Sequence, residues 1–173
     1  EAGLNARWLK KDMTHEETRQ FTKDVLNHMR ERLSDYQEQY GDLYNLEATP
    51  AESTTYRFAK HDKERFPDII TANENGTPYY TNSSHLPVGY TEDIFTALEI
   101  QDELQTRYTS GTVFHAFLGE KLPDWKAAAT LVRKIAENFK LPYYTMSPTY
   151  SICHEHGYLV GEQPACPHCG APT

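Results

Sequence analysis

Apolar and aromatic side chains recur every three or four positions along the early part of the chain, from Phe21 to Tyr40. This period places them on one face of a helix. Thr14 and Glu17 have the spacing of a capping box, in which two side chains hydrogen-bond free backbone N–H groups at a helix start. Gly41 is a residue type that commonly ends helices. The pattern predicts a long amphipathic helix from Thr14 to Gly41.

Three further helices are predicted from residue types that cap helix N-termini. They are 49–66 from Thr49, 91–107 from Thr91 and 124–139 from Asp124. Short β-rich segments lie among the helices, at 43–48, 77–81, 112–118 and 141–146. Helices alternating with short strands predict an α/β layer or a piece of an α/β barrel, followed by a small module after Ser151.

Length and composition restrict the class of protein. The chain has 173 residues, of which 38% are hydrophobic, which is enough for one domain with its own core. No stretch approaches the roughly 20 apolar residues that a membrane span needs. Lys and Arg number 17 against 25 Asp and Glu, a net charge of -8, which argues against binding to nucleic acid through phosphate contacts. We therefore expect no membrane and no nucleic-acid partner.

All three cysteines fall between positions 153 and 169. Cys153 and His156 form a Cys-x2-His pair, and Cys166 and Cys169 form a Cys-x2-Cys pair after nine intervening residues. Two such pairs supply the four ligands that tetrahedral zinc accepts in closed, structural sites. His154 and His168 lie nearby, but His156 occupies the fourth position of the paired spacing. A redox role for Cys166 and Cys169 is the alternative.

Four polar residues, Asn82-Ser83-Ser84-His85, follow the predicted strand 77–81. The C-terminal ends of strands are where α/β proteins bind ligands. The alternative is a loop whose Asn and Ser side chains bond their own backbone. Spacing alone leaves both interpretations open.

Two weaker candidates accompany this loop. Thr109-Ser110-Gly111-Thr112 is a polar turn that either presents N–H groups to an anion or only ends a helix at its glycine. Glu47 is a lone carboxylate on a predicted strand and a candidate general acid or base.

Several long strings occur together and in a fixed order: NLEATPAE at 45–52, YYTNSSHLPV at 79–88, YTSGTV at 108–113, and the Cys/His segment 150–170. In this combination the chain resembles the anaerobic ribonucleoside-triphosphate reductases, the class III, glycyl radical type. The resemblance covers nearly the whole sequence. It implies part of a ten-stranded α/β barrel with a C-terminal zinc ribbon, divided into barrel residues 1–148 and ribbon residues 149–173.

The resemblance also implies an oxidoreductase that makes deoxyribonucleotides for DNA replication in the cytoplasm. Its substrates would be ribonucleoside triphosphates, its reductant formate or a thiol system, and its assembly a homodimer. A radical S-adenosylmethionine enzyme would generate a glycyl radical outside this chain, and that radical would pass to a cysteine. Because the string 79–88 matches the family, the resemblance implies that the loop Asn82 to His85 lines the nucleotide pocket.

All three cysteines are assigned to zinc, and no glycyl radical motif precedes Thr173, so we expect this chain alone to be inert. The competing interpretation is a stand-alone zinc-ribbon module that binds RNA or a protein partner. Residues 151–173 contain no Lys or Arg, although an RNA-binding ribbon would normally carry cations beside its metal ligands.

Overall fold

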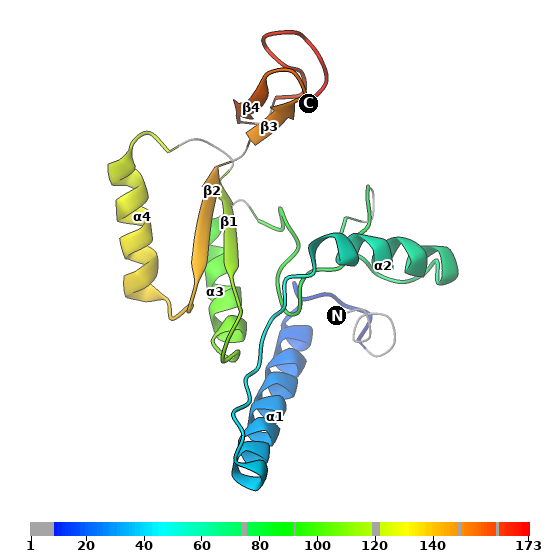
Figure 1. Cartoon of the computed structure of the whole chain (residues 1–173), viewed down its shortest axis with the longest axis vertical. Coiled ribbons are helices and arrows are strands. Elements are labelled where there is room, and N and C mark those ends of the chain that lie inside the picture. The colour runs from blue at the N-terminus through cyan, green and yellow to red at the C-terminus, as the bar shows by residue number, and fades with distance from the viewer. Residues whose placement is uncertain (1–8, 74–75, 92, 119–121, 149, 162) are drawn as a thin grey trace. The chain divides into compact units, whose positions relative to one another are not determined.

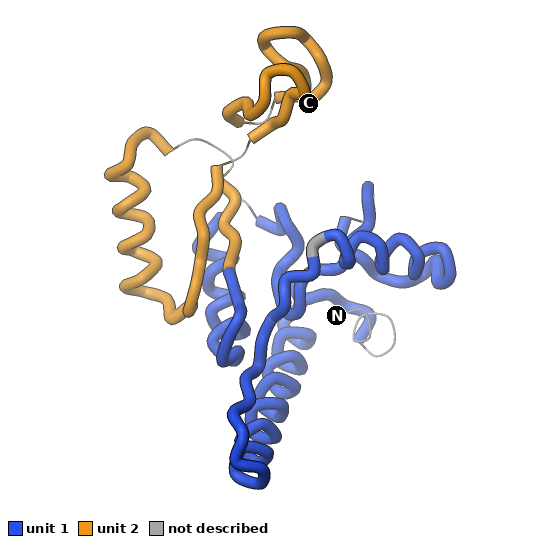
Figure 2. Tube along the Cα trace, in the orientation of Figure 1, with its two compact units in different colours: residues 1–113 blue, residues 114–173 orange. Residues whose placement is uncertain are grey.

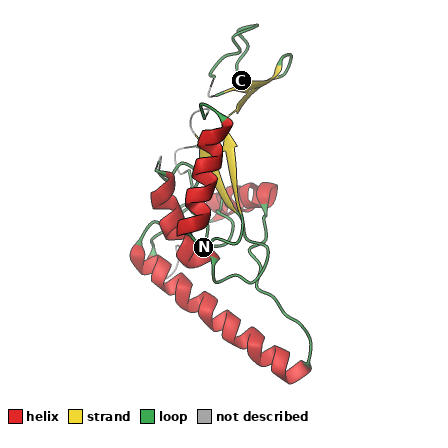
Figure 3. Ribbon diagram, turned by 90° about the vertical axis from the view of Figure 1, so that its left-hand side faces the viewer, coloured by secondary structure: helices red, strands yellow, loops and turns green. Residues whose placement is uncertain are grey.

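The computed structural model of the chain describes residues 9–73, 76–91, 93–118, 122–148, 150–161 and 163–173. The chain divides into two compact units, residues 1–113 and 114–173 (Figure 2), and each is treated by itself. Helix is the predominant regular element in the described part (Figure 3). The functional division into 1–148 and 149–173 stays a prediction.

The longest described helix of unit 1 is α1, Glu16–Tyr40 (Figure 1). Its C-terminus is closed as predicted by Gly41, whose left-handed backbone (φ 75°) lets its N–H bond Gln37 O. The predicted capping box is wrong. The N-cap residue is His15, and the Thr14 hydroxyl bonds the carboxylate of Asp12, so it is not available to the helix.

Helices α2, Glu52–Arg65, and α3, Ile94–Gln105, confirm two predicted helices but start later than predicted. In α3 the N-cap is Asp93 rather than Thr91, because the Asp93 carboxylate accepts from the N–H groups of Phe95 and Thr96. In α2 the N-cap residue is Ala51 rather than Thr49.

The predicted strands 43–48 and 77–81 are wrong as strands. The described residues there form only isolated bridges, Glu47 with Ser110 and Ala72 with Tyr79. The core of unit 1 is made instead by α1, α3 and the extended segment before α2. Its buried apolar side chains include Leu98 and Leu104 of α3, Leu26 of α1, Met13 and Leu46.

Unit 2 contains a parallel strand pair, β1 at Phe114–Leu118 and β2 at Tyr144–Pro148, joined through α4 at Trp125–Asn138. Parallel strands need such a crossover. Asp124 caps α4 as predicted, since its side chain accepts from Ala127 N at 2.8 Å. Strand β2 begins three positions later than the predicted 141–146, because it pairs from Tyr144 opposite Phe114.

The C-terminal segment contains the antiparallel hairpin of β3, Tyr150–Cys153, and β4, Gly157–Val160. The chain thus has α/β content, and its described strands form two two-stranded sheets, so a ten-stranded barrel is not shown by this chain. None of the described helices combines the length and apolar character needed to cross a membrane.

Candidate functional site

The hairpin and the segment after it bring together the four predicted metal ligands. Cys153 ends β3, His156 lies in the turn, and Cys166 and Cys169 follow β4. Their ligand atoms all lie within 4.8 Å of one another. The sulfur of Cys153 is 3.6 Å from His156 Nδ1 and 3.6 Å from the sulfur of Cys169. Three sulfurs and one imidazole nitrogen are the donor atoms of a typical closed tetrahedral zinc site.

Local backbone geometry creates this convergence. Gly157 and Gly170 each follow a ligand and have φ 72°, a left-handed conformation that side chains with a Cβ rarely adopt. The turn at Cys166 is held by Gly170 N donating to Cys166 O at 2.8 Å. Cys153, Cys166 and Leu159 are buried together as a small core. The paired spacing therefore brings the four side chains together because a separate turn closes each ligand pair.

The surroundings of Cys153 favour its thiolate, which is the form that binds metals. A hydrogen bond with the His156 ring, helped by the N–H groups of His156 and Glu155, lowers the pKa of the Cys153 thiol to about 6. All three cysteines are free thiols in the structure. Because Cys166 lies 3.6 Å from His156 Nδ1, the Cys166 thiol belongs to the four-residue cluster, which favours metal binding over an isolated redox pair.

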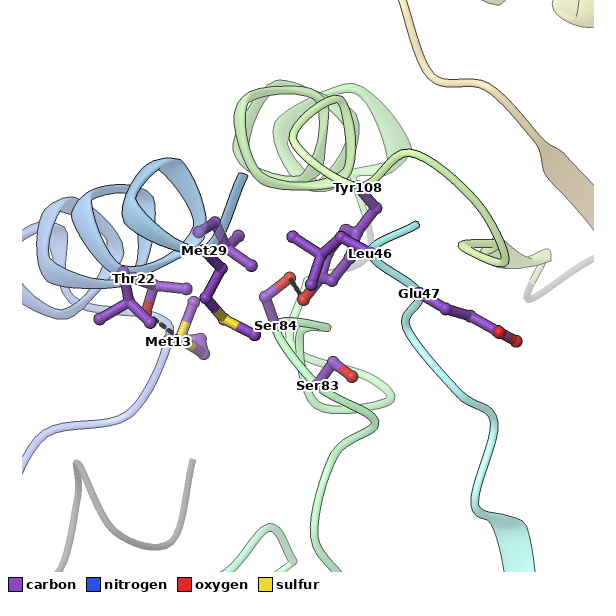
Figure 4. A pocket seen from close by; sticks show the side chains of 10 residues that line it. Met13, Thr22, Met29, Leu46, Glu47, Ser83, Ser84 and Tyr108 are labelled. Atoms are coloured by element: carbon purple, nitrogen blue, oxygen red, sulfur yellow. Dashed lines mark hydrogen bonds between the residues drawn. The ribbon is translucent and has the colours of Figure 1, made fainter. Parts of the chain in front are cut away.

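Unit 1 contains a cavity of about 290 Å³ (Figure 4). Its apolar wall comes mainly from α1, and its polar groups come from Thr22 of that helix and from three other segments. The lining residues are Met13, Thr22, Val25, Leu26, Met29, Leu46, Glu47, Ser83, Ser84 and Tyr108. Its volume lies at the lower end of the roughly 300 to 1,000 Å³ that small-molecule sites occupy.

The predicted loop reaches this cavity through only two of its four residues, Ser83 and Ser84. Ser83 has a left-handed backbone (φ 44°), and Ser84 is buried with its hydroxyl accepting from Tyr108 at 3.1 Å, as Figure 4 shows. The side chain of Asn82 instead accepts from Ala51 N at 3.0 Å, which caps α2.

His85 closes the same loop. Its Nδ1 lies 2.5 Å from Asn82 O and its Nε2 lies 2.7 Å from Val113 O. The ring therefore bridges the loop and the residue before β1. Of the four predicted residues, two line the cavity and two hold the loop in place.

The second polar turn supports another wall of the cavity. Thr109 N and Ser110 N both donate to Leu46 O, at 3.0 and 3.1 Å, so these amides are not available for an anion. A side chain at Gly111 would overlap that of Glu47, and Gly111 also has φ 57°, so glycine is required there. Glu47 lines the cavity, but its side chain is exposed and its carboxylate points away from the other lining side chains (Figure 4).

Sequence reasoning missed Gln101, Gln105 and Tyr108. The two glutamines are 1% and 0% exposed and hydrogen-bond one another inside unit 1. Their spacing on the same side of α3 as Leu98 could have identified them, because polar residues at apolar positions of a helix need buried partners.

The family model described as "Anaerobic ribonucleoside-triphosphate reductase" matches residues 1–173. This chain therefore belongs to the anaerobic ribonucleoside-triphosphate reductase family. Two curated relatives carry the same description. The protein of Enterobacteria phage T4 is 29% identical over 108 residues, 62% of this chain and 17% of the relative. That of Haemophilus influenzae is 25% identical over 151 residues, 84% of this chain and 21% of the relative.

The fold is that of solved anaerobic ribonucleotide reductases. The Thermotoga maritima enzyme with glycerol in the active site has a TM-score of 0.64 and 24% identity, and the match covers 91% of this chain and 25% of that one. The same enzyme in complex with dATP and CTP has a TM-score of 0.62 and 23% identity, over 91% of this chain and 24% of that one. The chain thus spans about a fifth of the length of its curated relatives.

Proposed function

We propose that this chain forms part of an anaerobic ribonucleoside-triphosphate reductase, an oxidoreductase that converts ribonucleoside triphosphates to deoxyribonucleotides. The match of the family model to the full 173 residues carries this proposal. The relatives and solved structures named above are all reductases, so they give the stand-alone zinc-ribbon interpretation no support.

The cavity of unit 1 would hold part of the nucleotide. Ser83 and Ser84 would face it, while Asn82 and His85 would keep the loop in position, Asn82 through Ala51 N and His85 through Asn82 O. The Thermotoga maritima enzyme solved with dATP and CTP supports nucleotide recognition as the role to test. Glu47 lines the same cavity and is our candidate for moving a proton there, which would require its carboxylate to turn inward from the position in Figure 4.

The cluster of Cys153, His156, Cys166 and Cys169 would hold a structural zinc ion. Four protein ligands leave no open coordination position, so the ion would supply folding energy and no chemistry. Because these ligands include every cysteine of the sequence, the cysteine that takes up the radical would lie elsewhere in the reductase.

The rest of the assembly follows from the family. Strands β1 and β2 would belong to the ten-stranded barrel within residues 1–148, and residues 149–173 would form the zinc ribbon. The reductase would work as a cytoplasmic homodimer in deoxyribonucleotide supply for DNA replication. It would use formate or a thiol system as reductant and a glycyl radical made by a radical S-adenosylmethionine activating enzyme.

The test compares the complete parent reductase with the 173-residue chain. Both are incubated without oxygen with activating enzyme, S-adenosylmethionine, each ribonucleoside triphosphate, and either formate or a dithiol. We expect deoxyribonucleotide from the parent and none from the chain alone. An activated parent that carries a glycyl radical by electron paramagnetic resonance and yields no deoxyribonucleotide with either reductant contradicts the proposal.

A further inference from the structure

Three buried polar side chains form a directional chain of hydrogen bonds inside unit 1, here called the glutamine relay. The Thr112 hydroxyl donates to Gln105 Oε1 at 3.1 Å, and Gln105 Nε2 donates to Gln101 Oε1 at 2.8 Å. Gln101 Nε2 then donates to the backbone oxygen of Ser84 at 3.1 Å. All three side chains are at most 4% exposed.

Stability alone does not explain these residues. Each amide must be stripped of water, and a buried polar group without its partner costs more free energy than a bonded one returns. The neighbouring buried positions of α3, Leu98 and Leu104, are apolar. Replacing both partners of a buried hydrogen bond by apolar groups of the same shape is often nearly neutral. What a fully bonded network adds is one fixed geometry.

Each end of the relay bonds a segment connected to one wall of the cavity. At one end, Ser84 belongs to the loop 82–85. At the other end, Thr112 closes the turn 109–112, whose first two amides hold Leu46 O at 3.0 and 3.1 Å. Leu46 and Glu47 line the same cavity as Ser84. Helix α3 therefore connects two loops that are far apart in sequence.

We propose that Gln101 and Gln105 are positioning residues that hold loop 82–85 and turn 109–112 in one fixed relation. Two direct contacts join the same segments, Tyr108 donating to Ser84 Oγ at 3.1 Å and His85 Nε2 lying 2.7 Å from Val113 O. The relay adds a third, fully buried connection between the loop and the turn. Only the identity of the ligand rests on the proposed function; the coupling of the two loops does not.

The first test removes one end of the relay and measures the other. Thr112→Val keeps the shape of the side chain and leaves Gln105 Oε1 without its donor. Amide hydrogen exchange of the 173-residue chain, without nucleotide, should speed up at His85, whose N–H donates to Asn82 O at 2.9 Å. We expect a factor of about five to ten, which corresponds to the loss of one buried hydrogen bond.

The matched control is Thr71→Val, since Thr71 is also buried but its hydroxyl has no partner among the described residues. This control should leave exchange at His85 unchanged. Faster exchange confined to residues 109–113 in Thr112→Val would overturn the relay. Faster exchange at His85 supports the relay only if it recurs when the relay is broken at Gln105, because His85 Nε2 also lies 2.7 Å from the oxygen of Val113, next to Thr112.

A second pair of variants keeps the proposal testable if Thr112→Val does not fold. Gln105→Met breaks the relay at its centre with similar volume, and Leu104→Met is its control on the same helix. Gln105→Met should speed exchange in both loops, and an effect on one loop or neither overturns the relay. In the intact reductase it should raise KM for nucleotide several-fold with a smaller change in kcat. If exchange speeds up in both loops but KM is unchanged, the relay is supported and the assignment of the nucleotide to this cavity is rejected.

Discussion

The two candidate sites differ in what their polar side chains bond to. In the metal cluster of unit 2, the sulfurs of Cys153 and Cys166 and the ring of His156 point at one another. In the cavity loop of unit 1, Asn82 and His85 are bonded to backbone groups of the protein itself. The four converging side chains of the cluster indicate which kind of ligand they bind. In the loop, two of the four polar side chains are already bonded to backbone groups, so only the remaining ones, Ser83 and Ser84, line the cavity.

The two sites also differ in how far apart their residues lie along the sequence. The metal ligands span residues 153–169, and each pair is closed by a local turn. The cavity draws on segments between Met13 and Tyr108. Changes in the metal cluster should therefore have large, all-or-none effects, and changes in the cavity should have graded ones.

The largest expected effect is on metal content. Purified chain should contain close to one zinc per molecule, and Cys166→Ser combined with Cys169→Ser should abolish it, because two of the four ligands are removed. Zinc binding contributes about 10 to 16 kcal/mol in small zinc domains, so the hairpin module should also unfold. Elemental analysis and circular dichroism measure both.

The control for this variant is His168→Ala. The His168 ring lies 5.2 Å from that of His156 but is not among the four converging ligands. Loss of zinc in His168→Ala, or zinc retained in the double cysteine variant, would show that the ligand set is wrong.

Acidification should release the metal more gradually. The thiols must lose protons to bind, so zinc affinity falls as pH falls. Because the pKa of the Cys153 thiol is lowered to about 6, proton competition at that sulfur grows as pH drops through this value. Despite the hydrogen bond from Ala171 N, desolvation and the sulfurs of Cys166 and Cys153 raise the pKa of the Cys169 thiol, so protons compete there at higher pH. We expect full occupancy at neutral pH and release below about pH 5 to 6. A chromogenic chelator followed across pH measures it, and release that increases with rising pH would contradict the assignment.

A smaller effect should separate the two roles within the cavity loop. Asn82→Ala removes the acceptor for Ala51 N and should lower the free energy of unfolding by about 1 kcal/mol, measured by denaturant titration. Asn82→Asp keeps the acceptor oxygen and should retain that stability.

Activity of the intact reductase then decides whether Asn82 also contacts nucleotide. If it does, both variants should lower kcat/KM by about tenfold to a hundredfold, or roughly 1 to 3 kcal/mol. Normal turnover per folded molecule in both variants would limit Asn82 to holding the loop, and Ser83→Ala would then be the variant expected to weaken nucleotide binding.

The smallest expected effect concerns helix caps. Asp124→Ala should destabilise the chain by about 1 kcal/mol, since Asp124 accepts from Ala127 N at the start of α4. Thr49→Ala should change stability by less than about 0.5 kcal/mol, because α2 begins after Ala51 and its cap comes from Asn82. Thermal unfolding compares them, and equal losses would contradict this difference between the two helices.

These outcomes depend on how far each interaction reaches along the chain. The helix periodicity, the Asp124 cap, the Gly41 stop and the Cys/His spacing act over a few residues, so the sequence alone predicts them. The long matching strings likewise carried the resemblance to the reductases, and the match of the family model to the full chain confirms it.

Longer-range features needed the tertiary structure. The segments 43–48 and 77–81 have β-rich composition, but a strand also requires a partner, and each described segment finds only one bridge. No local pattern could show that Asn82 caps a helix 31 positions earlier or that Gln101 reaches Ser84 across 17. The sequence by itself determined the family, most helices and the metal-ligand pattern, because these are encoded locally. Only the packing of α1, α3 and the loops decided which polar groups face the cavity, since a side chain is free to bind a ligand only after the protein's own hydrogen bonds have been satisfied.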